Sequence, residues 1–273
     1  MPTGVNAEDV RLAELVATLS YAADLGLGQP LAHCMRKTVI ALRMADLLGV
    51  SDAEREATYY TGLMANVYCH ADASEQTSWF GDDISFKSAG FASLDMSTPQ
   101  MIAMILRLTA SQGSGLERVK RVAALTTMRK RVSEFLTTHS TLASQFATQI
   151  GLDSTVATAI RHNYEQWDGK GMPEHLSGDQ ISLPARLTLL AGSVEVFGRR
   201  GVETARRVAR RHRGSQYDPD MVDVFCDHAS ELLDGLDEAT DWDRFLDKQP
   251  PLSRLVSVTT STEHSRLWPT WLT

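Results

Sequence analysis

The sequence of 273 residues is poor in cysteine and in positive charge, and it has no long uncharged apolar run. Its three cysteines, Cys34, Cys69 and Cys226, are far apart and form no Cys-x-x-Cys pair, which argues against a disulfide framework or a thiolate zinc site. Cysteine used in this way fits a reducing, cytoplasmic compartment. The first residues lack a basic segment followed by an apolar one, so we expect no signal peptide. No apolar run reaches the roughly 18 residues of a membrane span, so no membrane association is expected.

The net charge of -7 argues against a general nucleic-acid or anionic-membrane binder, because both need a basic surface. One local exception is an arginine-rich run, with arginines at positions 199, 200, 206, 207, 210, 211 and 213. Such a stripe could bind nucleic acid or an acidic partner. Few aromatic residues interleave with it, and we therefore favour a solvated face or intramolecular salt bridges.

Apolar residues recur mainly at helical spacing, and strand-like alternation is scarce, so the sequence predicts an all-α fold. Ser51 and Glu54 form a capping-box pattern at the start of one helix, and Gly49 follows the end of the helix before it. We predict one helical domain over 1–249 and a low-complexity tail over 250–273, with 69–98 as the least regular stretch. The expected helices cover residues 10–25, 31–48, 51–68, 99–110, 116–125, 128–150, 154–166, 184–197, 202–212, 219–236 and 241–246.

The most specific stretch is 162–197. Here a predicted helix ends at Glu165 and a turn containing Asp168, Gly169, Gly171 and Pro173 follows. Glycines permit positive φ in such a turn, and Pro173 stiffens its exit. From the residues alone, this stretch is a tight turn that joins two helices and whose conformation depends on its glycines.

The order of these residues resembles the HD-GYP branch of the HD-type metal-dependent phosphohydrolases. There, His-His-Glu precedes Asp-Gly-x-Gly-Tyr-Pro, and a helix beginning Ala-Arg-Ile and carrying Asp follows; Met172 stands here in place of the Tyr. Upstream, the helix bearing His33 and Arg36, the helix over 59–70 and the helix bearing His139 occur in the matching order. The resemblance implies an HD-domain-like multi-helix bundle. It is greatest to the degenerate half found in actinobacterial HD-domain regulatory proteins.

In the resembling family, carboxylates and imidazoles hold one or two metal ions that orient a phosphoryl group and generate hydroxide. His33 and His139 match imidazole positions of that pattern, but its other positions carry different residues here: Ala65-Asn66 replaces His-Asp, Cys69 replaces Lys, Asn163-Tyr164 replaces His-His, and Gly192 replaces Asp. Two imidazoles without a carboxylate would leave a cation bound mostly to water. The resemblance therefore predicts that the inherited metal site is lost, and we expect no cofactor.

A substitute metal site is the alternative. A cluster just after the degenerate helix could converge with His33 and His139 and would suit zinc, iron or manganese; its members are Cys69, His70, Asp72 and Glu75. The simpler interpretation is a polar loop with exposed acids and a half-buried thiol, because neither Cys-x-x-Cys nor His-x-x-x-His spacing is present.

Two functions follow from these observations. The first is a non-catalytic signalling module whose central pocket binds an anionic small molecule or nucleotide, or whose surface binds a protein partner or a second copy of the chain. The pocket residues implied by the resemblance are His33, Arg36, Asn66, Cys69 and His139, and a collapsed core around the two histidines is the competing view. The second function is a metal-dependent phosphohydrolase or cyclic-dinucleotide phosphodiesterase with a rearranged metal site. The lost carboxylates favour the first, non-enzymatic function.

Overall fold

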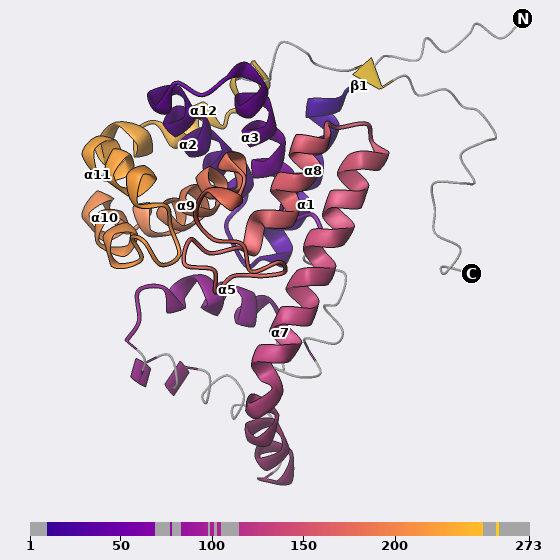
Figure 1. Ribbon diagram of the computed structural model, residues 1–273, viewed down its shortest axis with the longest axis vertical. Helices are drawn as coiled ribbons and strands as arrows, with labels where there is room; N and C mark the ends of the chain where they lie inside the picture. Colours follow the sequence, from indigo (N-terminus) through magenta and orange to yellow (C-terminus); the bar gives the residue numbers. More distant parts are fainter. Residues whose placement is uncertain are drawn as a thin grey trace, which may run out of the picture.

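The computed structural model describes residues 10–68, 77, 83–97, 99–100, 103–104, 115–247 and 255–256. This part of the chain is mostly helical, which confirms the all-α prediction (Figure 1). β1 (Val10–Arg11) and β2 (Leu255–Val256) pair as a short antiparallel ribbon. The helices are α1 (Leu12–Gly26), α2 (His33–Leu48), α3 (Asp52–Met64), α5 (Asp83–Ser93), α7 (Gly115–Gln149), α8 (Ser154–Arg161), η1 (His162–Tyr164), η2 (Gly178–Gln180), α9 (Leu183–Gly198), α10 (Val202–Arg211), α11 (Pro219–Leu233), α12 (Leu236–Ala239) and α13 (Trp242–Leu246).

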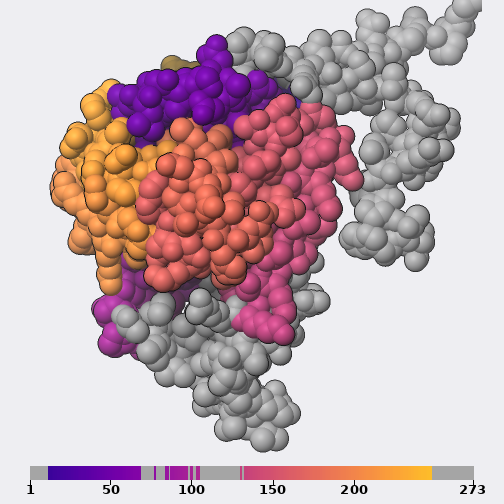
Figure 2. All heavy atoms as spheres, viewed as in Figure 1, coloured from indigo at the N-terminus to yellow at the C-terminus, as the bar shows by residue number. Residues whose placement is uncertain are grey.

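Helix α2 lies between two hydrophobic clusters and belongs to both. Met35 and Val39 pack into a cluster with residues of α1, α3, α7 and α8. Ile40 and Met44, on another face of the same helix, pack into a cluster with residues of α9, α10 and α11. Figure 1 shows α7 and α8 on one side of the bundle and α10 and α11 on the other. In the space-filling view of Figure 2, the 150–200 segment and the visible part of α7 form a continuous surface.

Two predicted helix ends are confirmed. The Ser51 hydroxyl accepts a hydrogen bond from the Glu54 backbone N–H at 3.3 Å, and the Glu54 carboxylate accepts one from the Ser51 N–H at 3.0 Å. Together they satisfy backbone donors that the first turn of α3 leaves unpaired. Gly49 ends α2 in the left-handed conformation, at φ 64°. No helix in the described ranges is both long and apolar enough to cross a membrane.

The sequence-based helix boundaries need three corrections. The helices expected at 116–125 and 128–150 form one helix, α7, because Thr126 and Thr127 include neither Gly nor Pro and nothing between them breaks the hydrogen-bond ladder. The irregular stretch 69–98 contains α5. The helices expected to reach 68 and 166 end at Met64 and Arg161. Most of the helix expected over 99–110, and the tail other than Leu255–Val256, lie outside the described residues.

The turn after η1 is ordered by a buried carboxylate and by two glycines with different roles. Glu165 is fully buried and accepts hydrogen bonds from the backbone N–H groups of Glu174 (2.7 Å) and Leu176 (3.0 Å). Gly169 has the predicted positive φ, 78°. Gly171 lacks the positive φ that we expected. A Cβ at this position would overlap the backbone of Glu165 and Gln166. Close approach of two chain segments, and not a left-handed conformation, therefore requires glycine at 171.

This difference predicts unequal costs of substitution. Gly171→Ala should lower the free energy of unfolding by about 3 kcal/mol, because the added methyl meets backbone that cannot rotate away. Gly169→Ala should cost only about 1 kcal/mol, the strain of a left-handed alanine. Urea denaturation would measure both. Gly90→Ala in α5, where an added Cβ meets nothing within 4 Å, is the control and should be neutral or slightly stabilising. Equal stability of Gly171→Ala and the parent chain would contradict this account.

Candidate functional site

A cavity of about 370 Å³ lies among α2, α5, α7, α9 and the turn after η1. Figure 1 shows α5 crossing one end of the bundle, with α7 running alongside. Apolar side chains dominate the cavity wall, including Phe91, Leu94, Phe135, Leu136, Met172 and Leu189. Polar groups are fewer and lie mainly on the core side; they include His33, Lys37, Asn66, His139, Asn163 and Ser193, with Lys87 on α5. An apolar pocket with a few converging polar groups is the usual form of a small-molecule site.

His33 begins α2 and is completely buried. Its Nδ1 lies 2.5 Å from Oε2 of Glu195, a contact that needs Nδ1–H as donor because an ionised carboxylate only accepts. Burial lowers the pKa of His33, against the opposing effect of the Glu195 hydrogen bond, so the neutral imidazole is favoured. Its Nε2 then carries a lone pair, and this atom has no hydrogen-bond partner within the described part of the chain. His33 is therefore a buried acceptor at the cavity wall.

Glu195 on α9 holds this histidine in place through a cluster of charges. The Nε of Arg36 donates to Oε1 at 2.7 Å, and Arg199 donates to both carboxylate oxygens. Burial alone would raise the pKa of Glu195, but the hydrogen bonds from His33 and Arg199 outweigh it and lower the pKa to about 2. The carboxylate is therefore ionised, and it joins α2 to α9 beside the cavity.

The structure brings together three of the predicted pocket residues and places a fourth, Arg36, outside the cavity. His33, Asn66 and His139 line one cavity, so the core around the histidines has not collapsed. Arg36 does not line it; its guanidinium is turned to Glu195 and, at 3.6 Å, to Asp237. Cys69, with the other members of the proposed substitute site (His70, Asp72 and Glu75), lies outside the described residues.

The predicted motif loop forms one edge of the cavity. Glu165 and Gly171 are part of its wall. Asp168 instead stabilises the turn, accepting hydrogen bonds from the Lys170 N–H at 3.1 Å and from the Lys170 Nζ at 2.5 Å. Pro173 follows Met172 through a cis peptide bond. His162 is buried beside the turn and accepts a hydrogen bond from the Ser182 N–H at 3.1 Å.

Sequence reasoning missed Lys37, Lys87 and Phe91. Lys37 lies one turn after His33 on α2, and its i, i+4 spacing from that histidine was the available signal. Lys87 and Phe91 come from α5, in the stretch that we expected to be irregular. The ring of Phe91 meets the His33 ring edge to face, with 5.7 Å between ring centroids.

The described cavity does not fit the metal ion that the family resemblance implies. Its donors are two imidazoles and side-chain amides, with the Lys37 ammonium among them. The one carboxylate on its described wall, Glu165, has both oxygens bound to backbone N–H groups. Within the described ranges, no group of three or more His, Cys, Asp or Glu side chains is placed to hold a metal. A divalent cation here would lack the carboxylates that neutralise its charge.

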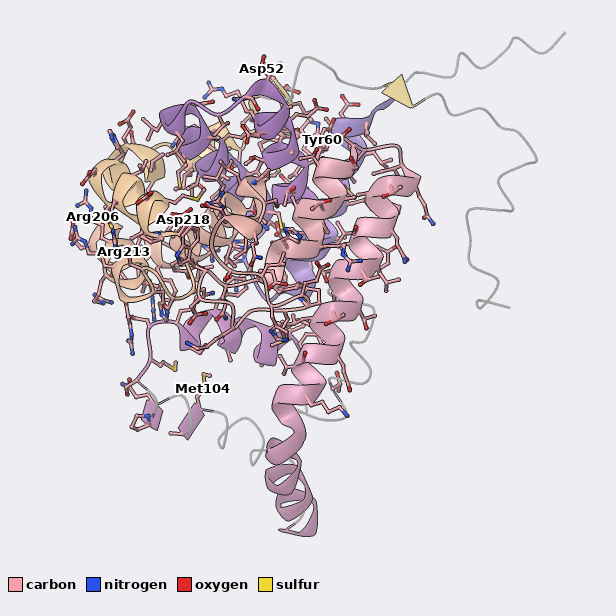
Figure 3. All side chains as sticks on the ribbon, viewed as in Figure 1. Asp52, Tyr60, Met104, Arg206, Arg213 and Asp218 are labelled. Atoms are coloured by element: carbon pink, nitrogen blue, oxygen red, sulfur yellow. The ribbon has the colours of Figure 1, made fainter. Side chains whose placement is uncertain are left out.

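The arginine-rich run makes intramolecular contacts, as predicted. The Nη2 of Arg207 lies 3.0 Å from Oδ2 of Asp95, and Arg211 donates to the Met96 carbonyl at 2.7 Å. Arg213 pairs with Asp223 at 2.6 Å. Figure 3 shows Arg206 and Arg213 at the outer edge of the bundle beside α10. These arginines attach the segment after α5 to α10 and brace α11.

The charge cluster at Glu195 predicts a pH-dependent stability. Glu195→Gln should lower the free energy of unfolding at pH 6 by about 3 kcal/mol, because it leaves cations buried without their anion. The folded-state pKa of about 2 lies below the ordinary 4.5, so the carboxylate's contribution is present above pH 4.5 and is lost as the pH falls toward 2. The difference in melting temperature between the two proteins should therefore narrow from pH 6 to pH 3. Glu203→Gln, which removes an exposed ion pair, is the control. If the difference in melting temperature between the parent and Glu195→Gln stays constant from pH 6 to pH 3, the low pKa assigned to Glu195 is wrong.

The comparisons with known proteins agree with this fold. A family model described as an HD domain matches residues 117–221. The 3'3'-cGAMP-specific phosphodiesterase 3 of Vibrio cholerae is 29% identical over 216 residues, covering 78% of this chain and 47% of the relative. A probable cyclic di-GMP phosphodiesterase of the same organism is 35% identical over 79 residues, covering 26% of this chain and 18% of the relative.

A solved structure of a cyclic GMP-AMP-specific phosphodiesterase of V. cholerae superposes with a TM-score of 0.64 at 25% identity, covering 89% of this chain and 55% of that one. The chain thus spans about half the length of the 3'3'-cGAMP-specific phosphodiesterase 3 that it matches. The finer resemblance, to the degenerate half of actinobacterial proteins, stays a prediction. The matched domain model, the relatives and the shared helical architecture confirm that this chain resembles HD-domain proteins and has the HD-domain fold.

Proposed function

We propose that this chain binds a cyclic dinucleotide in the cavity bounded by His33 and His139. The relatives are named as phosphodiesterases of 3'3'-cGAMP and cyclic di-GMP, so they support the cyclic-dinucleotide function over a module without that chemistry. The observation that carries the proposal is the composition of the cavity wall. It combines cationic and polar groups on the core side with aromatic and aliphatic side chains on α5 and α7.

Each part of a cyclic dinucleotide finds a matching group in this wall. A phosphodiester is anionic and accepts hydrogen bonds, which Lys37, Lys87 and the amide of Asn66 can donate. Purine rings are flat and largely apolar, and Phe91, Phe135 and Met172 offer surfaces for them. The volume of about 370 Å³ lies within the range of small-molecule sites.

Hydrolysis of the bound ligand is the second candidate function, favoured by the phosphodiesterase activity in the names of the relatives. The described wall lacks metal carboxylates, so this activity would depend on the substitute cluster of Cys69, His70, Asp72 and Glu75. A protein partner or second copy of the chain, and the cytoplasmic location, stay predictions.

The binding proposal predicts saturable calorimetric titrations with 3'3'-cGAMP or cyclic di-GMP, and a rise of several degrees in the melting temperature at saturation. His139→Gln and Lys87→Ala should each weaken binding about tenfold, the effect of one lost hydrogen bond to a charged group. Lys130→Ala is the control, since this lysine is exposed on α7 and pairs with Glu134. Absence of binding by both cyclic dinucleotides would refute the proposed function.

A separate assay decides the second candidate. The protein is incubated with 3'3'-cGAMP and Mn²⁺, Fe²⁺ or Zn²⁺, and linear dinucleotide products are measured by chromatography. Turnover that chelator abolishes, and that Cys69→Ser/Asp72→Asn removes while binding persists, would establish hydrolysis through the substitute cluster. Binding without turnover under any of these metals would leave recognition as the function of the described cavity.

A further inference from the structure

Lys37 is an unusual cation for the centre of a protein. It is only 3% exposed, although lysine is rarely buried to this extent without a partner. Within the described ranges the structure shows no ion pair or hydrogen bond of its ammonium group. The only carboxylate on the described cavity wall, Glu165, is committed to two backbone N–H groups. The side chain thus brings a positive charge to the cavity without a negative charge opposite it.

The path of the Lys37 side chain depends on Gly192. A Cβ added at Gly192 would lie 3.1 Å from Cδ and 3.7 Å from Cγ of Lys37, so the lysine stem runs along the bare backbone of α9. Position 192 is where the family resemblance places a metal-binding aspartate. A side chain at 192 would therefore press on the lysine stem, which would have to shift by a few tenths of an ångström. The glycine gives the lysine room to run along α9 into the cavity.

The neighbours of Lys37 point to an anionic ligand. Asn66, whose side-chain amide can donate a hydrogen bond, lines the same cavity, while Nε2 of His33 is an acceptor open to an N–H or O–H of the ligand. A buried ammonium is stable only with an anion or with hydrogen-bond acceptors. A phosphodiester supplies both, and the cavity otherwise offers the lysine no described carboxylate.

We propose that the ammonium of Lys37 is the counter-charge for the ligand's phosphodiester, in the place of the metal ion of the family, so that this site recognises its ligand without metal. This inference rests on the proposed cyclic-dinucleotide function and adds the residue and the charge that carry it. It also separates recognition from hydrolysis, because an ammonium neutralises a phosphate but does not generate hydroxide as a metal ion does.

The test compares the parent chain with Lys37→Met, which keeps the length of the side chain and removes its charge, and with Lys130→Met as a matched control at an exposed lysine. Calorimetry measures 3'3'-cGAMP binding in EDTA and in Mn²⁺, and thermal unfolding is followed with and without inorganic phosphate. The parent affinity should be the same within about twofold in both buffers, and Lys37→Met should lower it at least about tenfold.

Thermal unfolding supplies a readout that a purely structural lysine would not give. Without ligand, Lys37→Met should melt at the same or a higher temperature than the parent, because an uncompensated buried charge has been removed. With phosphate, the parent should gain stability and Lys37→Met should not. A lower melting temperature of ligand-free Lys37→Met, with phosphate stabilisation intact, would show a structural lysine and overturn the inference.

The remaining outcomes distinguish this inference from the proposed function. If EDTA abolishes cyclic-dinucleotide binding, or if Lys37→Met binds like the parent, the metal-free assignment is wrong while the proposed function stands. If the parent binds neither cyclic dinucleotide but phosphate stabilises it through Lys37, the proposed function is wrong and the anion site stands. Gly192→Asp provides a second variant, since a carboxylate beside Lys37 should remove the phosphate response even where the protein remains folded.

Discussion

The buried carboxylate of Glu195 is the constraint on which both the fold and the cavity depend. It receives His33 and Arg36 from α2 and Arg199 from the end of α9, so it joins two helices that contribute His33 and Lys37 (α2) and Ser193 (α9) to the polar cavity wall. A buried ionised carboxylate is costly unless it is paired and hydrogen-bonded, and here both of its oxygens are used. The same contacts require a proton on Nδ1 of His33 and leave Nε2 to the cavity. The hydrogen bonds that hold α2 against α9 therefore also fix the protonation of His33 at the cavity wall.

The charges on the described cavity wall differ from those of a metal site. A metal centre surrounds a doubly charged cation with carboxylates, so that the ligand meets a nearly neutral cluster. Here the described wall has imidazoles, amides and the Lys37 ammonium, and in the proposed complex the phosphodiester of the ligand supplies the negative charge. Such a wall favours recognition of one phosphodiester. Hydrolysis has to use residues beyond the described wall, and the two functions therefore separate experimentally as well as chemically.

Local signals in the sequence predicted local structure well. The capping box of Ser51 and Glu54, the left-handed Gly49 and the helical periodicity are all present, because each depends on neighbours a few residues away. The meeting of His33, Asn66 and His139 followed only from the family resemblance, since these residues are distant in the sequence. Other features had no local signal. The overlap that makes Gly171 necessary, and the path of Lys37 along Gly192, are contacts between separate segments.

The position of Arg36 illustrates the same limit. Its spacing from His33 suggested a place in the pocket, but a guanidinium near a buried carboxylate forms hydrogen bonds with it, and Glu195 lies 159 residues away in the sequence. A partner at that separation cannot be inferred from helical periodicity. The arginine therefore supports the histidine instead of facing the ligand.

The two sides of the cavity differ in how firmly they are held. The core side rests on α2 and α9, with their buried charge cluster and large hydrophobic clusters. On the other side, α5 contributes Phe91 and the turn after it contributes Leu94, and contacts of the arginine-rich run with Asp95 and Met96 attach this turn to α10. Exposed ion pairs of this kind contribute little each. The arginine-rich run of this acidic chain thus holds one wall of the cavity in place mainly through weak, exposed ion pairs.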